Sequence, residues 1–377
     1  MDKLSRINYI LTETCNLHCK FCFQNNLSRS SNKLTHKEII DFTNFVIKNY
    51  KKDKNNSLDL NLIGGEPLLF NDFTIFIKVI NLYNNNNFKI NTISIFSNLS
   101  IENLSFEKFL EYVYDKVFDI KIISTVNTNN KYPNRLFGKN IENQQKYIQK
   151  LKSKFPNINI YYDSSVLDKK VLKNYEKILE YNFNHIDEVP DMIMPEYISQ
   201  KENIDKEDVY KMCKIFFKLV DKYKLDIHND NIIKYINKSA LRYLKVLLFN
   251  FLDEYRIISC EPFQKEIGVS PGGYLSPCSR ALEFKTDFPT IYDNPNFENF
   301  NIFHNDKKQF QTETGDNCLE CLLRTDCTSC KFMPAKYIIK NNIFINPKEK
   351  CLYKLEHFNA QYEALKEYLS RRNDEKS

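Results

Sequence analysis

Three cysteines near the start of the chain have the spacing of a metal site. The segment TETCNLHCKFC places Cys15, Cys19 and Cys22 in a C-x3-C-x2-C pattern. Three thiolates on one short loop could bind zinc with a distant fourth ligand, or three irons of a [4Fe–4S] cluster. In the second case one iron keeps a position for a ligand from outside the protein. The apolar residues 7–11 predict a buried strand directly before this loop, and α/β enzymes keep their chemistry at such strand ends.

A second polar feature follows the next predicted strand. The run LDLNLI at residues 58–63 ends in Gly64, Gly65, Glu66 and Pro67. Two glycines let a backbone approach a ligand closely, and the carboxylate of Glu66 could bind an ammonium group. A GGEP turn alone is a weak signal, because turns of this kind are common. Combined with the C-x3-C-x2-C loop after the preceding strand, it favours an iron–sulfur cluster over zinc.

A second group of cysteines lies in the C-terminal half of the chain. Its members are Cys260, Cys278, Cys318, Cys321, Cys327, Cys330 and Cys351. Paired C-x2-C spacings are a strong metal signal, and a zinc ribbon would need only four of these thiols. The remaining cysteine, Cys213, lies four residues from both Val209 and Phe217 on an apolar face. This position predicts a buried core cysteine rather than a metal ligand.

Alternating strands and helices must position these groups. After the first strand, strands are predicted at 58–63, 91–97, 119–125, 157–166 and 186–194. Helices are predicted at 35–50, where Thr35 and Glu38 form a capping-box pattern, at 72–83, after a Ser105 cap, and at 141–155. About six β-α units imply parallel strands with helices outside, as an open sheet or a barrel. From about residue 255 helix periodicity fades, and residues 355–369 predict a final helix.

Composition narrows the class of protein. The 377 residues suggest two or three domains, and the net charge of +6 is spread over Lys- and Asn-rich stretches without a nucleic-acid footprint. No signal peptide is evident, and the longest apolar stretch, at 241–252, is too short for a membrane span. We therefore expect a soluble, cytoplasmic protein with no membrane partner. In that reducing compartment eleven cysteines indicate metal binding rather than disulfides.

At the cysteine loop and the GGEP turn the sequence resembles the radical S-adenosylmethionine (AdoMet) enzymes. In that family AdoMet binds the fourth iron, and a low-potential electron splits it into methionine and a 5′-deoxyadenosyl radical that abstracts hydrogen from substrate. The resemblance implies an α/β fold with a partial (β/α)6 TIM-type barrel, in agreement with the six β-α units. It also implies that Gly64, Gly65, Glu66 and Pro67 hold the methionine amino group, while the Phe21 backbone meets the adenine.

Four later positions are similar to AdoMet contacts in the family. Ser124, at the end of DIKIIST, resembles the strand-4 serine that contacts ribose. Arg135 resembles the arginine that contacts the methionine carboxylate. Ser97 and Asn98 end the third strand and are expected at the same edge of the sheet. The alternative is that all four are ordinary polar residues at strand ends.

The second cysteine group resembles the SPASM domain of radical SAM enzymes, which is loop-rich and carries two auxiliary [4Fe–4S] clusters. The resemblance implies a barrel domain at 1–225, a helical linker at 226–254, a SPASM domain at 255–355, and a C-terminal helix and tail at 356–377. The spacing C-x5-C-x2-C is one residue shorter than the common family pattern. A loop can absorb that difference, so we expect three [4Fe–4S] clusters in all.

The ligation implied by the family is interleaved. One auxiliary cluster takes Cys318, Cys321, Cys327 and Cys351. The other takes Cys260, Cys278 and Cys330, which is one ligand short, and this predicts an open iron.

The SPASM resemblance implies a peptide or protein substrate. The leading prediction is a peptide maturase that forms a thioether or carbon–carbon crosslink. Sulfatase-maturating enzymes, which oxidise Ser or Cys to formylglycine, carry an aspartate directly after the cysteine matching Cys278. This chain has Ser279 and Arg280 there, which disfavours that alternative since serine is a poor general base. A SPASM-type dehydrogenase acting on a small molecule stays open, and no catalytic acid or base is assigned.

A non-enzymatic electron carrier is disfavoured by the complete cysteine loop and GGEP turn. The expected partners are an external electron donor (a flavodoxin or ferredoxin) and a separate leader-peptide recognition protein. Because the chain starts directly at the first barrel strand, recognition of a leader peptide is expected from such a separate protein, from the barrel mouth, or not at all.

Overall fold

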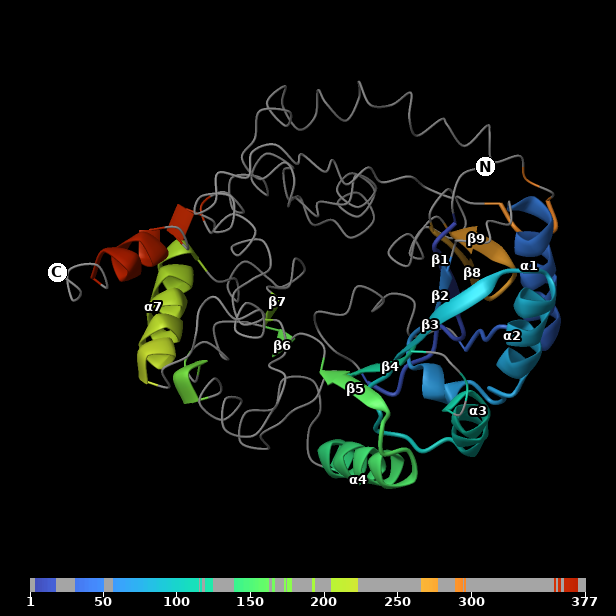
Figure 1. Cartoon of the computed structure of the whole chain (residues 1–377), viewed down its shortest axis with the longest axis horizontal. Coiled ribbons are helices and arrows are strands. Elements are labelled where there is room, and N and C mark those ends of the chain that lie inside the picture. Colours follow the sequence, from blue (N-terminus) through green and yellow to red (C-terminus); the bar gives the residue numbers. More distant parts are fainter. Residues whose placement is uncertain are drawn as a thin grey trace, which may run out of the picture. The chain divides into compact units, whose positions relative to one another are not determined.

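The structure is a computed structural model of the chain (Figure 1). It describes residues 4–17, 31–50, 57–114, 116, 119–124, 139–162, 165–166, 173, 175–177, 192–193, 205–222, 266–276, 289–293, 295, 356, 359–360 and 363–371. The chain divides into two compact units. The first contains residues 1–163 and 260–300, and the second contains 164–259 and 301–377.

The first unit is built on a seven-stranded sheet with the order β5-β4-β3-β2-β1-β8-β9. All neighbours are parallel except the hairpin of β8 and β9. The strands are β1 (Arg6–Ile10), β2 (Ser57–Ile63), β3 (Lys89–Phe96), β4 (Asp119–Ser124), β5 (Asn159–Tyr162), β8 (Glu266–Ser270) and β9 (Tyr274–Ser276). The predicted α/β class with a parallel-dominated sheet is confirmed, and it is consistent with a partial barrel. The carboxyl ends of β1, β2, β3 and β4 share one edge of the sheet.

Helices α1 (His36–Asn49) and α2 (Ile75–Asn85) pack on the outer face of this sheet (Figure 1). The predicted capping box starts α1, because the Thr35 hydroxyl accepts from the backbone N–H of Glu38, and the Glu38 carboxylate accepts from that of Thr35. The ring of Tyr9 in β1 packs edge-on against Phe42 of α1 and Phe76 of α2. Its hydroxyl lies 2.9 Å from that of Thr43 and 3.0 Å from that of Tyr83. This face of β1 is thus a dry core with its polar groups paired.

The opposite face of the sheet is polar at its middle. Asn61 Nδ2 donates to Asn8 Oδ1 at 2.8 Å, and Asn8 Nδ2 donates to Glu266 Oε1 at 2.6 Å. Asn61 and Asn8 are register partners on β2 and β1, while Glu266 lies two positions before Gly268, the partner of Asn8 on β8. Barrel interiors are dominated by bulky branched residues. These two amides and one carboxylate therefore make the inner face unusually polar.

Helix α3 (Leu104–Tyr114) begins one residue before its predicted cap, Ser105. The side chain of Asn103 accepts from the backbone N–H of Phe106, which makes Asn103 the cap, and the prediction of Ser105 was wrong. Ser105 lies in the first turn, and its hydroxyl donates to Asn103 Oδ1. Asn103 is the better cap here because its amide also donates to the carbonyls of Leu68 and Phe70, which ties α3 to the turn after β2.

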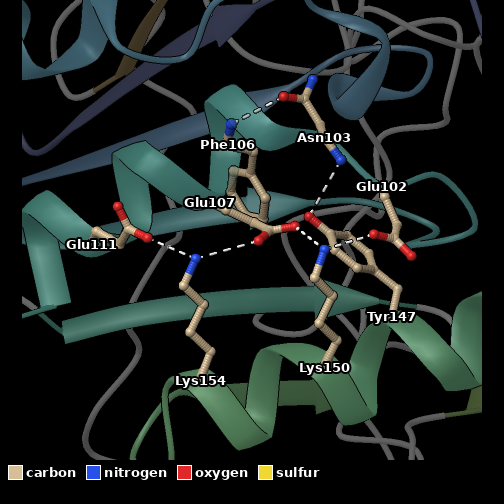
Figure 2. A network of polar contacts seen from close by, with 8 residues as sticks. All are labelled: Glu102, Asn103, Phe106, Glu107, Glu111, Tyr147, Lys150 and Lys154. Carbon is tan, nitrogen blue, oxygen red and sulfur yellow. Dashed lines mark hydrogen bonds and ion pairs between the residues drawn. The ribbon is translucent and has the colours of Figure 1, made fainter.

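Helix α4 (Lys139–Lys154) is fastened to α3 by charge (Figure 2). Lys150 lies 2.7 Å from Glu102 and 2.8 Å from Glu107, while Lys154 lies 2.6 Å from Glu111 and 3.4 Å from Glu107. Glu107 is nearly buried, and its carboxylate is shared by both lysines. A nearly buried carboxylate with two partners fixes the helices more firmly than isolated surface pairs do.

The second unit is described in a few elements. The short strands β6 (Ser165–Val166) and β7 (Met192–Ile193) pair in parallel. Helix α7 (Lys206–Lys222) packs against the C-terminal helix at 363–371, where the ring of Tyr368 stacks on that of Phe217 at 4.4 Å. The predicted C-terminal helix is therefore present. In the described part of both units, no helix is both long and apolar enough to cross a bilayer.

Candidate functional site

The base of the cysteine loop and the GGEP turn are joined by backbone hydrogen bonds. Beyond the end of the β1–β2 pair, Gly65 N donates to Thr12 O at 2.7 Å, and Glu66 N donates to Thr14 O at 2.9 Å. Cys15 is the next residue after Thr14. The two motifs that carried the sequence prediction are thus in direct contact, because parallel strands deliver both to one edge.

The two glycines allow this contact. A Cβ atom at Gly64 would lie 2.5 Å from Thr12 O, and one at Gly65 would lie 2.3 Å from Thr14 O. Gly64 also has a φ of +152°, which disfavours residues with a side chain. The close approach that the glycines permit is therefore to the chain's own cysteine loop, whereas the sequence prediction assigned it to a ligand.

The loop that carries the three cysteines is closed where it returns to the sheet. Thr12 and Lys33 form an antiparallel bridge, and Leu34 N donates to Leu11 O at 2.9 Å. Asn32 Nδ2 donates to the carboxylate of buried Glu13 at 3.1 Å. Within the described start of the loop, the backbone N–H of Leu17 points at the Cys15 sulfur at 3.4 Å.

Glu66 links the turn to the end of β3. Its Oε1 accepts from Leu68 N at 2.9 Å and from Ser97 Oγ at 2.6 Å, and its Oε2 accepts from Asn98 N at 2.8 Å. The side chain is 1% exposed. Burial raises the pKa of this carboxyl above its usual 4.5, and the three donated hydrogen bonds oppose that shift. The structure thus places Ser97 and Asn98 at the same edge of the sheet as Glu66.

This raised pKa predicts a pH dependence of stability. A carboxyl with a higher pKa in the folded than in the unfolded chain stabilises the fold fully below pH 4.5, and that stability is lost as the pH rises through the folded value. We expect Glu66→Gln to flatten this slope in hydrogen exchange of peptides from β2 and β3, measured from pH 4 upward. Ser97→Ala removes a donor that lowers the pKa of Glu66, so it should extend the slope to higher pH. If stability changes with pH in the same way in the wild type, Glu66→Gln and Ser97→Ala, the pH dependence does not come from Glu66.

The Asn98 side chain forms a closed ring with two others. Its Nδ2 donates to Asn16 Oδ1 at 2.9 Å, Asn16 Nδ2 donates to Ser100 Oγ at 2.8 Å, and Ser100 Oγ donates to Asn98 Oδ1 at 2.6 Å. Asn16 directly follows Cys15. The ring therefore connects the cysteine loop to the end of β3. Sequence reasoning missed Asn16 and Ser100, since neither is in a recognised motif.

Ser124 lies at the same edge but on the outer face of the sheet. It follows Ile120 and Ile122 at alternate positions of β4 and is buried like them. Its hydroxyl accepts from Gln144 Nε2 of α4 at 3.3 Å, and the same amide donates to the carbonyl of Asn98 at 2.7 Å. Gln144 was missed, although a polar residue on the buried stripe of α4, one turn before Tyr147, is a visible signal.

The other predicted site residues lie outside the described residues. They are Cys19, Phe21, Cys22, Arg135, Cys260, Cys278, Cys318, Cys321, Cys327, Cys330 and Cys351. Neither of the two described cysteines, Cys15 and Cys213, forms a disulfide. Burial raises the pKa of Cys213 to about 12. Because metals bind the thiolate, the raised pKa disfavours a ligand role for Cys213, which is half-buried on α7.

The groups at this edge suit a cluster and its small-molecule ligand. Cys15 is half-buried at the end of the sheet and supplies a sulfur ligand of the kind that iron–sulfur clusters use. Gly64 and Gly65 have carbonyls that accept no hydrogen bond from the described part of the chain, so the turn has acceptors available for an ammonium group. The residues present therefore fit the cofactors that the sequence resemblance implies.

Comparisons with known proteins agree with this site. Residues 6–147 match the family model of a 4Fe–4S single cluster domain. None of the curated proteins matches the chain. A solved structure of anSMEcpe with bound AdoMet is 16% identical, with a TM-score of 0.66, and the match covers 99% of this chain and 96% of that one.

Two further matches are structures with peptides. The complex of anSMEcpe with AdoMet and the Cp18Cys peptide is 15% identical, covers 99% of both chains and has a TM-score of 0.66. SuiB of Streptococcus suis bound to precursor peptide SuiA is 15% identical, covers 77% of this chain and 63% of that one, and has a TM-score of 0.51. The match to a 4Fe–4S domain and the fold shared with AdoMet-bound structures agree with the resemblance that the cysteine loop and the GGEP turn carry.

Proposed function

We propose that this chain is a radical SAM enzyme that modifies a peptide. The observation that carries the proposal is the hydrogen bond from Glu66 N to Thr14 O at 2.9 Å, which fixes the GGEP turn beside Cys15. Cys15, Cys19 and Cys22 hold the first [4Fe–4S] cluster in this proposal. The cluster with bound AdoMet supplies, after one-electron reduction, the carbon radical that abstracts hydrogen from substrate.

The residues around the turn bind and orient AdoMet. Because the Glu66 carboxylate already accepts three hydrogen bonds from the protein, its task is to hold the turn against the end of β3. The carbonyls of Gly64 and Gly65 would then hold the methionine amino group, and Pro67 begins the short helix at Pro67–Leu69. The contacts of Phe21 with adenine and of Arg135 with the methionine carboxylate stay as the family resemblance implies.

Two side chains have a smaller role toward AdoMet than the resemblance implies. Ser97 donates to Glu66, and its oxygen accepts from Leu99 N at 2.9 Å. Ser124 faces α4. Both therefore shape the edge of the sheet, and a contact of Ser124 with ribose would have to use its hydroxyl proton.

Two auxiliary clusters complete the proposed cofactor set. Cys318, Cys321, Cys327 and Cys351 hold one. Cys260, Cys278 and Cys330 hold the other and leave one iron open for a substrate thiolate. The raised pKa of Cys213 supports leaving this thiol out of both sets.

The proposed substrate is a peptide in which the enzyme forms a thioether or carbon–carbon crosslink. Solved structures with the same fold contain a bound peptide, and this supports the substrate class. The main alternative is oxidation of Ser or Cys to formylglycine, and a second is dehydrogenation of a small molecule. We further propose a flavodoxin or ferredoxin as electron donor, a separate leader-peptide recognition protein and a cytoplasmic location.

The proposal predicts hydrogen transfer from a peptide. The anaerobically reconstituted protein, reduced with dithionite, is incubated with AdoMet and a library of cysteine-containing peptides deuterated on carbon. We expect deuterium in 5′-deoxyadenosine, together with a crosslinked peptide that has lost one deuterium from carbon and one further hydrogen or deuterium. A thioether would leave no free thiol, whereas a carbon–carbon crosslink would keep it. A peptide that gains a carbonyl at the cysteine position would favour formylglycine formation, and AdoMet cleavage without deuterium transfer from any peptide would contradict a peptide substrate.

A further inference from the structure

Asn98 joins four separate segments of the first unit. Its backbone N–H donates to Glu66 in the turn after β2, and its carbonyl accepts from Gln144 of α4. Its side-chain amide donates to Asn16, directly after Cys15, and its side-chain oxygen accepts from the backbone and hydroxyl of Ser100. Both backbone groups and both side-chain groups thus have partners within the protein.

We propose that Asn98 is a positioning residue that holds the cysteine loop against the end of β3. It acts through Asn16, so that the loop is ordered before a cluster binds and retains the cluster afterwards. This rests on the proposed function for the identity of the bound group. It replaces the predicted direct contact of Asn98 with AdoMet, because the side chain is already committed to Asn16 and Ser100.

The backbone directly after Asn98 has an unusual conformation that supports this role. The next residue, Leu99, is fully buried and has a φ of +54°, a left-handed conformation that is uncommon for residues other than glycine. The hydroxyl of Ser97 accepts from Leu99 N and stabilises the turn. Strained backbone of this kind persists where the surroundings enforce it and is found at functional sites. Here the left-handed turn follows Asn98 directly, before the chain reaches Ser100.

The support for Asn98 extends into the charge network of Figure 2. Gln144 is presented by α4, and α4 is held to α3 by the carboxylate of Glu107, which Lys150 and Lys154 share. In the same view Tyr147, one turn after Gln144, meets the backbone of Asn103. The Gln144 amide is therefore carried by a helix that is anchored to α3 by Lys150 and Lys154 and to the cap of α3 by Tyr147.

Two measurements on the full chain test the proposal. The first is hydrogen exchange of residues 12–17 in the protein without iron. The second is the rate at which a chelator removes iron from the first cluster. That iron is identified as the amount that the wild type holds in excess of a Cys15→Ala variant. We expect Asn98→Leu and Asn16→Leu each to speed both processes about tenfold, as for the loss of a hydrogen bond that orders a loop. The double variant should be little faster in either process than each single variant, because both single changes break the hydrogen bond between Asn98 and Asn16.

Two control variants separate positioning from general destabilisation. Asn16→Asp keeps the oxygen that accepts from Asn98 and loses only the donor to Ser100, so residues 12–17 should exchange more slowly in it than in Asn16→Leu. Tyr9→Phe removes the buried hydroxyl bonds to Thr43 and Tyr83 on the helix side of β1, so it should destabilise the sheet without loosening residues 12–17. If Asn98→Leu and Asn16→Leu match the wild type in exchange, or if Tyr9→Phe has the same effect as they do, the proposal is wrong.

A failure of the proposed function would give a different result from a failure of the role proposed for Asn98. In that case the wild type would hold no more iron than Cys15→Ala, while the exchange measurement would still decide the role of Asn98.

Discussion

Replacing Cys15, Cys19 and Cys22 together by alanine is expected to abolish the formation of 5′-deoxyadenosine from AdoMet. The reason is that no other group in the described edge of the sheet can replace three thiolates as iron ligands. Glu66, the carboxylate of the turn, already accepts hydrogen bonds from Leu68, Ser97 and Asn98. The measurement is chromatography of the products after incubation with AdoMet and dithionite under anaerobic conditions.

Cys213→Ala is the matched control for this experiment. It also removes a thiol, but one on α7 whose pKa is raised to about 12 by burial. We expect it to leave 5′-deoxyadenosine formation unchanged and to cost about 1 kcal/mol of stability, as is usual for a small truncation in a core. Continued AdoMet cleavage by the triple variant would overturn the assignment of the first cluster, whereas loss of iron in Cys213→Ala would mean that this thiol is a ligand.

The elements around the site could be predicted because local signals specified them. Short apolar stretches predicted β1 to β4, and the pair of Thr35 and Glu38 predicted the start of α1. The cap of α3 was misassigned because both Ser105 and Asn103 can cap a helix. What decides between them is the contact of Asn103 with the carbonyls of Leu68 and Phe70, and a local pattern does not contain that contact.

The sequence motifs of the site could be predicted, but the hydrogen bonds that connect them could not. Cys15 and Glu66 were expected near each other, since parallel strands end at one edge. The ring of Asn16, Asn98 and Ser100 depends on the left-handed backbone at Leu99, which no residue type at that position announces. β8, which pairs with β1 from far along the chain, was also not foreseen. Its short run EIGVS gives too weak a signal to separate a strand from a turn-rich region.

The glycine pair is where sequence and structure give different reasons for the same residues, and this leads to the second large effect. A Cβ atom at Gly65 would lie 2.3 Å from the carbonyl oxygen and 2.6 Å from the carbonyl carbon of Thr14, directly before Cys15. Backbone atoms cannot rotate away as a flexible side chain can. Gly65→Ala must therefore push the cysteine loop off the turn and break the hydrogen bonds to Thr12 and Thr14.

We expect Gly65→Ala to destabilise the first unit by about 3 kcal/mol or more, at the upper end of what overpacking costs, and to prevent iron loading through Cys15. Gly268→Ala is the matched control, because its Cβ would meet Asn8 at 3.2 Å and Ile10 at 3.3 Å, both on the same strand β1 but away from the loop. That variant should cost about 1 kcal/mol and keep its iron. Denaturation and iron analysis of both variants show whether Gly65 is needed for the close approach of the cysteine loop or for that of a ligand. If Gly65 served only to admit a ligand, Gly65→Ala would fold as stably as Gly268→Ala and would lose only its affinity for AdoMet.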